Sequence, residues 1–499
     1  MLGWEGASRT ASEPTYVLAG WLFLRLLGLI YFVAFASLAT QIRGLVGSKG
    51  ILPAADFLSS RSRWGIRRFY RIPTVCWFNA SDGSLLFLSW TGAALSLLLI
   101  VGIAPTIVLG LLWLFYLSLF AVGRIFLGYQ WDILLLETGF LAIFLAPLEL
   151  TAHFPPVSAP PMIVRWLFWW LLFRLMFSSG MVKLRSADPT WRKLTALRYH
   201  YETQPLPTPL AWHAHHLSMW FHRFSAAAMF VIELLVPFLI IAPPPLRHLA
   251  AVVFMLFMAL IQLTGNYCFF NLLGIALSVL LLDDTLLQPV FRIFFPGIEM
   301  QLTAQPAFGE WNFAPVAALI LLLSLLPMLR LFRFEIAWPK PFVIFLDFFD
   351  PFRLVNSYGL FSVMTTQRPE IIVEGSLDGI NWLAYEFKWK PGDPKRAPRF
   401  VAPHQPRLDW QVWFAALGFY PNNPWFWRFL VRLLEGSPAV LFLLRSNPFP
   451  EVPPRFVRAV LYDYRFTDAE QRSATGVWWL RERRELYSPV IDKSDVMAA

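Results

Sequence analysis

Charged residues are scarce in this chain, and their scarcity argues against a water-soluble globular protein. Only 15% of the 499 residues are charged, whereas 57% are hydrophobic and the mean hydropathy is +0.53. A soluble domain carries about 25% charged residues, so this chain has too little polar surface to stay in water. Several apolar runs exceed the roughly 18 residues that indicate a transmembrane helix. The composition therefore predicts a polytopic membrane protein.

Cysteine is also rare, and the familiar catalytic motifs are missing. Cys76 lies in a loop and Cys268 in an apolar run, so a disulfide framework is not expected. The sequence has no P-loop, no usable dinucleotide fingerprint, no GxSxG element and no HExxH motif. We therefore expect no cofactor. The first apolar run is long enough to stay as an anchor, so we expect no cleaved signal.

The net charge of +10 is the remaining compositional feature that bears on partners. In a membrane protein, basic loops lie beside anionic headgroups, so the charge predicts contact with the lipid bilayer rather than with nucleic acid. Aromatic residues reach 17%, and part of that excess is expected at the two bilayer interfaces.

The apolar runs predict a mainly α polytopic bundle of about nine transmembrane helices within residues 1–333. One run of nearly forty residues is read as two spans that turn near Ala104-Pro105. The expected spans are 16–38, 85–104, 105–122, 128–147, 162–181, 219–241, 249–263, 269–282 and 314–332.

Residues 334–499 are richer in proline, arginine and aspartate, and we expect them to form an extramembrane, mainly β domain. An apolar strand, the Asp378-Gly379 turn and an alternating strand up to Trp389 predict a hairpin. A further strand is expected at 455–466, and a helix at 425–434 that ends before Gly436.

Two long basic loops, residues 41–83 and 183–218, interrupt the bundle. Arginines alternate with apolar residues at 61–71, which fits an amphipathic surface segment or, equally, a solvated basic loop. Loop 183–218 is rich in aromatic residues, which we expect to be exposed and to contact a client protein. The candidate client-contact residues are Trp191, Tyr199, Tyr201, Trp212 and, in the C-terminal domain, Trp410.

Five charged residues interrupt the expected membrane spans and their ends. Charges at this depth are costly and seldom left unpaired. Asp132 and Glu137 are five residues apart, so they point to different sides of a helix. Arg25, Arg124 and Arg174 are their candidate partners. We expect structural ion pairs, with proton handling or substrate contact as the alternative.

Lys183 follows a glycine at the end of an apolar span. A lysine at a span end commonly extends its ammonium group to the interface, but desolvation can also turn it into a base. His213, His215, His216 and His222 form a cluster that could bind a metal. No acidic or cysteine ligand lies close in sequence, so an interfacial role for these histidines is preferred and no metal site is expected.

Several stretches resemble the lipase maturation factor family. The similarity runs from the first span to about residue 470. The matching segments are 128–142, 173–174, 178–184, 188–191, 199–207, 265–271, 374–379, 402–410 and 447–450.

The resemblance implies a membrane factor that assists protein clients. In animals the family acts in the endoplasmic reticulum membrane and helps dimeric lipases fold and assemble. By this resemblance we expect a maturation factor rather than an enzyme, whose clients are secreted or membrane-attached proteins, with lipases as the candidate class. The short chain and few cysteines indicate a bacterial member.

A second resemblance is shorter and leads to a different function. Residues 180–184, with Asp188 and Trp191, are similar to the lysine segment of the transmembrane domain of vitamin K-dependent carboxylase. That resemblance implies a membrane enzyme on a lipid or quinone-like substrate, with Lys183 as the base and His200 or Glu202 assisting. A transporter is a third alternative, kept open by the two intramembrane acids.

The charge of the loops and the family resemblance predict opposite orientations of the protein in the membrane. The basic loops indicate the cytoplasm by the positive-inside rule. The lipase maturation factor resemblance implies instead that the loops and the C-terminal domain are extracytoplasmic. We follow the resemblance and expect a bacterial inner membrane protein, or an endoplasmic reticulum protein in a eukaryote.

Overall fold

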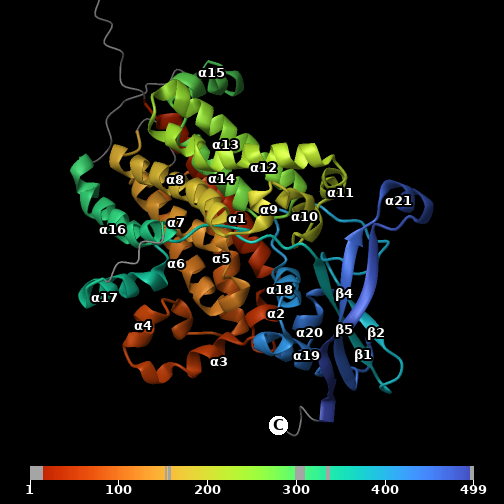
Figure 1. The fold of residues 1–499 in the computed structure, drawn as a ribbon. Helices are drawn as coiled ribbons and strands as arrows, with labels where there is room; N and C mark the ends of the chain where they lie inside the picture. Colours follow the sequence, from red (N-terminus) through yellow and green to blue (C-terminus); the bar gives the residue numbers. More distant parts are fainter. Residues whose placement is uncertain (1–14, 152–153, 155–158, 298–308, 333–337, 495–499) are drawn as a thin grey trace, which may run out of the picture.

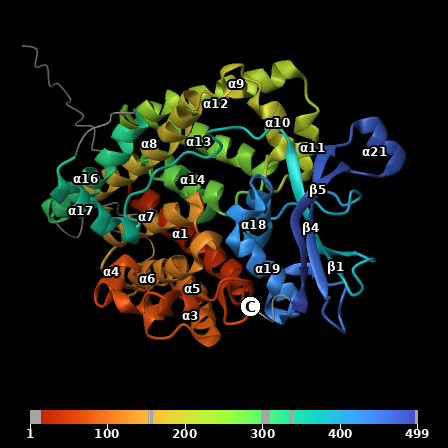
Figure 2. The same cartoon turned by 60° about the horizontal axis from the view of Figure 1, so that its bottom comes forward.

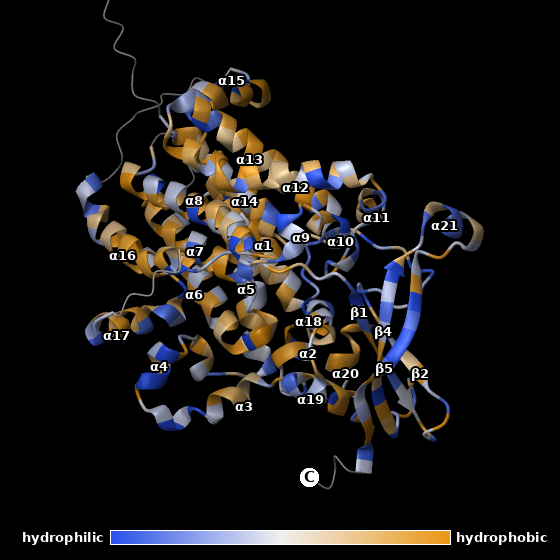
Figure 3. Cartoon of the chain, viewed as in Figure 1, coloured by the Kyte–Doolittle hydropathy of each residue, from blue (hydrophilic) through white to orange (hydrophobic). Residues whose placement is uncertain are grey.

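A helical bundle with a smaller β domain packed against it makes up the fold (Figures 1 and 2). This computed structural model describes residues 15–151, 154, 159–297, 309–332 and 338–494. The expected domain boundary at residue 334 and the first fourteen residues lie outside the described part. Hydrophobic residues dominate the bundle helices, whereas hydrophilic residues are frequent in the last two strands, β4 (Phe456–Phe466) and β5 (Trp479–Asp492) (Figure 3).

Seven helices in the described part are long and apolar enough to cross a bilayer, and an eighth crossing results if one bent pair is counted. The predicted class, a polytopic helical bundle followed by a mainly β domain, is therefore confirmed. Four of the seven are the single helices α1 (Val17–Ala39), α5 (Asp82–Val101), α8 (Met162–Arg185) and α13 (Pro244–Thr264). The other three include a 3-10 turn: α6 (Pro105–Gly123) continues through η3 (Arg124–Phe126), α12 (Met219–Leu234) continues through η4 (Val236–Ile241), and α16 (Ala314–Leu331) is preceded by η5 (Glu310–Phe313).

Two of the nine expected spans are shorter than the sequence indicated. Helix α7 (Gln130–Leu145) has 16 residues. At 1.5 Å per residue it is about 24 Å long, less than the roughly 30 Å of a hydrocarbon core. Helix α14 (Phe270–Val279) has 10 residues and bends by 110° into α15 (Asp284–Phe294). Most residues of α7 and α14 are buried, so other helices rather than lipid account for much of their hydrophobicity.

The predicted turn between the second and third spans is present. Gly102 ends α5 with φ of +88°, a left-handed conformation that glycine adopts without strain. Pro105 then begins α6, where its missing N–H is not needed. One long apolar run thus becomes two adjacent helices.

Short helices build the two loops, and both loops contact the C-terminal domain. Arg432 Nε donates to Gly50 O at 2.8 Å, and Trp212 Nε1 donates to Thr467 O at 2.9 Å. The first loop contains α2 (Ile42–Val46), α3 (Ala54–Ser59), η1 (Ser62–Trp64), α4 (Arg67–Arg71) and η2 (Val75–Trp77), and the second contains α9 (Pro189–Arg192), α10 (Ala196–Thr203) and α11 (Pro209–His215).

The C-terminal domain is built on a five-stranded antiparallel sheet with the order β3-β2-β1-β4-β5. The predicted hairpin is present: Val373 pairs with Tyr385, and Gly379 in the turn has φ of +78°. The expected second strand and helix are β4 and α19. The strands are β1 (Arg368–Ser376), β2 (Leu383–Phe387), β3 (Leu444–Ser446), β4 (Phe456–Phe466) and β5 (Trp479–Asp492).

Helices α18 and α19 pack against the sheet, and α18 also contacts the bundle. Helix α17 precedes the sheet and lies beside the bundle near α4 and α16 (Figure 1). The helices of this part are α17 (Lys340–Phe349), α18 (Arg407–Ala416), α19 (Pro424–Leu434), α20 (Pro438–Leu441) and α21 (Ala469–Thr475). The remaining 3-10 turns are η6 (Asp350–Phe352) and η7 (Tyr420–Asn422).

Candidate functional site at the seat of the C-terminal domain

Residues 183–218, here called the ledge, form the seat on which the C-terminal domain rests. Trp191 Nε1 donates to Phe361 O at 3.1 Å, and Trp212 Nε1 donates to Thr467 O at 2.9 Å. These two side chains are only 3% and 6% exposed. The expectation that they offer an exposed apolar surface to a client is therefore wrong, because this chain's own C-terminal domain covers them.

The other candidate contact residues are also withdrawn from solvent. Trp410 is buried and packs edge-on against Trp131, with ring centroids 4.8 Å apart. Tyr199 and Tyr201 are partly buried within the ledge. The structure thus brings these aromatic residues into interdomain packing instead of displaying them.

The side chain of Arg368 in β1 holds the ledge by binding backbone carbonyls of the ledge. Its guanidinium group is buried and donates to Glu202 O at 2.7 Å, to Pro205 O at 2.9 Å and also to Gln204 O. It also pairs with Glu370 at 2.7 Å, which keeps its charge compensated. An arginine fork can satisfy several oxygens at once, so one side chain fixes this bend of the ledge.

Glu202 contributes to the same seat with its carboxylate. Its Oε1 accepts from the backbone N–H of Phe466 at 2.6 Å. Burial raises the pKa of Glu202, although the bond from Phe466 and the charge of Arg368 act in the opposite direction. This carboxylate therefore fastens strand β4 to the ledge.

His200 lies in a hydrogen-bonded chain with Tyr267 and Gln204. Its Nε2 is 3.0 Å from the Tyr267 hydroxyl, which donates to Gln204 Oε1 at 2.6 Å. Because the hydroxyl has a single hydrogen, Nε2 of His200 must act as the donor to it. Burial, and then the charge of Lys183, lower the pKa of His200 to about 4, so the ring is neutral at pH 7.

Lys183 is buried in an ion pair with Glu233 of α12. Its Nζ lies 2.6 and 2.8 Å from the two carboxylate oxygens. A Cβ on Gly180 would lie 2.7 Å from Leu234, so the glycine lets α8 and α12 approach closely here. The pair compensates both charges, so the Lys183 ammonium group is neither extended into solvent nor free of a partner. The enzyme alternative gains no support from this geometry.

Glu137 of α7 pairs with Arg174 of α8, one of its three candidate partners. Its second oxygen, Oε2, accepts from Asn356 N at 2.9 Å and from the Tyr358 hydroxyl at 2.7 Å. Arg174 donates to Asn356 O at 3.2 Å. The segment that leads into the C-terminal domain is thus tied to a buried ion pair of the bundle.

Asp132 pairs with Arg407, a partner that the sequence did not reveal. The guanidinium nitrogens lie 2.8 and 3.0 Å from the two carboxylate oxygens, a bidentate arrangement. Tyr116 donates to Asp132 at 2.5 Å, and Arg407 donates to Phe126 O at 2.6 Å. An arginine at the start of α18 thereby enters the bundle and joins the two domains.

The other two candidate partners lie elsewhere. The guanidinium of Arg25 stacks over Trp21 at 4.9 Å, and that of Arg124 over Phe57 at 5.0 Å. Neither pairs with Asp132 or Glu137, so that part of the expectation was wrong. The count of charges gave no signal for Arg407, because three candidate arginines were already available for the two acids.

The histidine cluster makes backbone contacts. His216 Nδ1 lies 2.7 Å from Trp212 O, and His222 Nε2 lies 3.3 Å from His215 O. Within the described residues no group of three or more His, Cys, Asp or Glu side chains is placed to hold a metal ion. Cys76 and Cys268 are both buried and unpaired.

A family model matches each of the two domains. The family model of the lipase maturation factor transmembrane domain matches residues 18–289, and that of the lipase maturation factor C-terminal domain matches residues 354–489. No solved structure matches the chain.

Curated relatives match over nearly the whole length. Lipase maturation factor 2 of Rattus norvegicus is 37% identical over 95% of this chain and 83% of its own length. Lipase maturation factor 1 of Homo sapiens is 36% identical over 97% of this chain and 91% of its own length. These relatives are animal proteins, and the comparisons show neither the bacterial type nor the carboxylase resemblance. Because the two domain models and these identities together cover the chain, it belongs to the lipase maturation factor family.

Proposed function

We propose that this integral membrane protein is a maturation factor that helps lipase clients reach their folded, active state. The observation that carries the proposal is the match to lipase maturation factor 2 over 95% of the chain, through both domains. The geometry is consistent with this role, since the titratable residues of the ledge serve to hold the domains together. Lys183, His200 and Glu202, the candidate catalytic residues of the enzyme alternative, all lie in the ledge.

The client surface is proposed to lie on the C-terminal domain, away from the ledge. The β1–β2 turn carries three apolar side chains, Leu377, Ile380 and Leu383, that are 55%, 80% and 51% exposed. Phe442 and Val452 are also exposed in this domain. Exposed apolar groups on a rigid hairpin suit transient contact with an incompletely folded client.

Secretion of an active lipase tests this proposal. The full chain is expressed in animal cells that lack their own maturation factor, and lipase activity is measured per amount of secreted lipase protein. We expect activity with the wild type and its loss with the triple variant Leu377→Ser, Ile380→Ser and Leu383→Ser. The matched control replaces Leu480, Leu486 and Val490 of β5, which are similarly exposed. No rescue by the wild type would reject the function, and equal losses in both variants would reject the surface.

The ledge and the C-terminal domain are proposed to face the lumen of the endoplasmic reticulum, where such clients fold. The division into a membrane domain up to residue 333 and an extramembrane domain from 334 is part of the same proposal. The native cysteines are buried, so a single introduced cysteine reports orientation. A membrane-impermeant maleimide applied to sealed microsomes should label Thr151→Cys and spare Ser473→Cys; the opposite pattern would reverse the orientation.

A further inference from the structure

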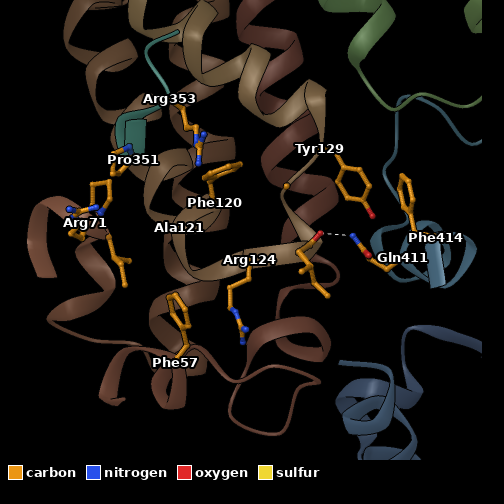
Figure 4. A pocket seen from close by; sticks show the side chains of 14 residues that line it. Phe57, Arg71, Phe120, Ala121, Arg124, Tyr129, Pro351, Arg353, Gln411 and Phe414 are labelled. Atoms are coloured by element: carbon orange, nitrogen blue, oxygen red, sulfur yellow. Dashed lines mark hydrogen bonds between the residues drawn. The ribbon is translucent and has the colours of Figure 1, made fainter. Parts of the chain in front are cut away.

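A cavity of about 690 Å³ lies where the first loop, the end of α6, η6 and α18 meet (Figure 4). Its walls come from four segments that are far apart in the sequence. The residues that line it include Phe57, Arg71, Phe120, Arg124, Arg353 and Gln411. None of the residues of the ledge lines this cavity.

The charge of the lining is of one sign. Arg71, Arg124 and Arg353 line the cavity, and its lining contains no aspartate or glutamate. Arg353 has one acidic neighbour, Asp350, at 3.2 Å, and that carboxylate is largely exposed to solvent. Within the described residues no carboxylate pairs with Arg71 or Arg124. The cavity therefore attracts anions.

Aromatic rings hold two of these guanidinium groups in place. Arg124 lies 5.0 Å from the Phe57 ring centroid and Arg353 lies 5.7 Å from that of Phe120. Arg61 stacks on Phe57 at 4.0 Å, which adds a fourth cation nearby. Stacking on a ring leaves the N–H edge of a guanidinium free for oxygen atoms, and that fork matches a phosphate.

An adjoining cavity of about 360 Å³ extends the same surface. It shares Arg124 and Gln411 with the first cavity and adds Arg428, Asn422 and Asn423. Its lining also lacks a carboxylate. The two cavities together offer room for a phosphate and for a polar group attached to it.

The position of the cavity favours a lipid over a free anion. Arg124 lies at the end of the membrane-spanning stretch Pro105–Phe126. The elements beside the cavity expose large apolar side chains: Ile66 and Phe78 in the first loop, and Ile344 in α17. Tyr70 and Phe348 join these two elements, with ring centroids 5.7 Å apart. Such amphipathic elements lie at the headgroup level of a bilayer.

We propose that this cavity is a binding site for the headgroup of an anionic phospholipid. The phosphate is held by Arg71, Arg124 and Arg353, and the acyl chains extend along the apolar side chains of the first loop and α17. Basic pockets at the membrane surface are suited to such headgroups.

Binding of short-chain lipids to the delipidated, detergent-purified full chain tests the site. Native mass spectrometry compares dioctanoyl phosphatidylglycerol with dioctanoyl phosphatidylcholine and with inorganic phosphate. We expect phosphatidylglycerol to bind most tightly and inorganic phosphate not to bind at the same concentration. Equal binding of the two lipids would overturn the charge selectivity, and equally tight binding of phosphate would overturn the assignment to a lipid.

Two double variants locate the binding. Arg71→Gln with Arg124→Gln should weaken phosphatidylglycerol binding by about 30-fold, since each arginine near a lipid surface contributes on the order of 1 kcal/mol. Arg63→Gln with Arg67→Gln removes the same charge from the same loop outside the cavity and should weaken it by about threefold or less. Equal losses in both would overturn the site. Arg71→Gln alone, at an exposed side chain, gives the same comparison if the double variant does not fold.

Discussion

The ledge and the basic stretch 61–71 of the first loop look alike in sequence and differ in environment. Both are basic, both carry tryptophan, and both interrupt the apolar field. In the ledge, Trp191 and Trp212 are almost fully buried, whereas Trp64 and Ile66 in the first loop are 47% and 81% exposed. The difference lies in what covers each one: the C-terminal domain packs on the ledge, whereas none of the elements that the structure describes covers Trp64 and Ile66 in this way.

This contrast shows that aromatic content alone does not identify a contact surface. An indole group has an apolar body and one N–H donor, so it suits a covered interface and a lipid headgroup region equally well. Each of the two buried indole groups of the ledge donates a hydrogen bond to a backbone carbonyl of the C-terminal domain. What packs against a tryptophan therefore decides whether it holds two domains together or lies exposed at the surface.

Replacing Arg368 by alanine should have the largest effect. The ledge carbonyls of Glu202, Gln204 and Pro205 would lose their buried donor, which should lower the free energy of unfolding by about 3–5 kcal/mol. Chemical denaturation in mild detergent, followed by tryptophan fluorescence, measures the change. Arg67→Ala in the first loop is the matched control and should stay within about 0.5 kcal/mol. Similar losses in both variants would contradict the contrast.

Trp212→Phe should have the next largest effect. It keeps an aromatic ring but leaves Thr467 O without its donor, and it removes part of a buried contact. We expect a loss of about 2–3 kcal/mol in the same measurement. Trp64→Phe is its control on the exposed side and should change stability by less than about 0.5 kcal/mol. A stable Trp212→Phe protein would show that the ledge indole is not held as described.

Acidification should weaken the ledge and leave the first loop unaffected. The pKa of His200 is about 4 in the folded chain, below its ordinary value of 6.5, so folding favours the neutral ring. The stabilisation is complete above pH 6.5 and is lost as the pH falls toward 4, by about 2 kcal/mol at pH 5. Residues 54–78 contain no histidine.

Glu202 acts in the opposite direction, because its raised pKa favours the protonated, folded form as the pH falls. A comparison with His200→Gln therefore isolates the histidine. The unfolding midpoint of the wild type should fall more steeply between about pH 6.5 and pH 4 than that of the variant. Parallel curves would mean that His200 is not the group responsible.

The smallest effect on stability is expected at Ile66. Ile66→Cys, labelled with a nitroxide, should leave the unfolding midpoint unchanged because the side chain is already exposed. In vesicles its label should lie about 5–10 Å inside the headgroup boundary. Ser473→Cys in the C-terminal domain serves as the aqueous reference. A label at residue 66 that is as accessible to water-soluble relaxants as the one at residue 473 would contradict the interfacial position.

The sequence predicted those elements whose signal is local. The Asp378-Gly379 turn with its alternating flanks was sufficient for the β1–β2 hairpin, and the Ala104-Pro105 turn was sufficient for two adjacent spans. Helix α7 was taken for a span because its apolar residues resemble a lipid-facing run, although it is surrounded by protein. Hydropathy does not distinguish these two environments.

The sites depend on residues that meet only in the folded chain, so the sequence predicted less of them. Arg174 was one of the three candidate partners of Glu137, because both residues lie in apolar helices. Arg407 was missed because it is 275 residues from Asp132 and belongs to a different domain. Arg71, Arg124 and Arg353 likewise come to line one cavity only after folding, so that cavity has no signature in any one segment.

The Asp132–Arg407 pair has a consequence for how the protein is made. The ribosome completes α7 long before it reaches α18, so the carboxylate of Asp132 waits inside a nascent membrane domain for its counter-ion. A chain that stops short of residue 407 leaves this acid buried in the bundle without its counter-ion. The bundle therefore reaches full charge compensation only when the C-terminal domain has docked on it.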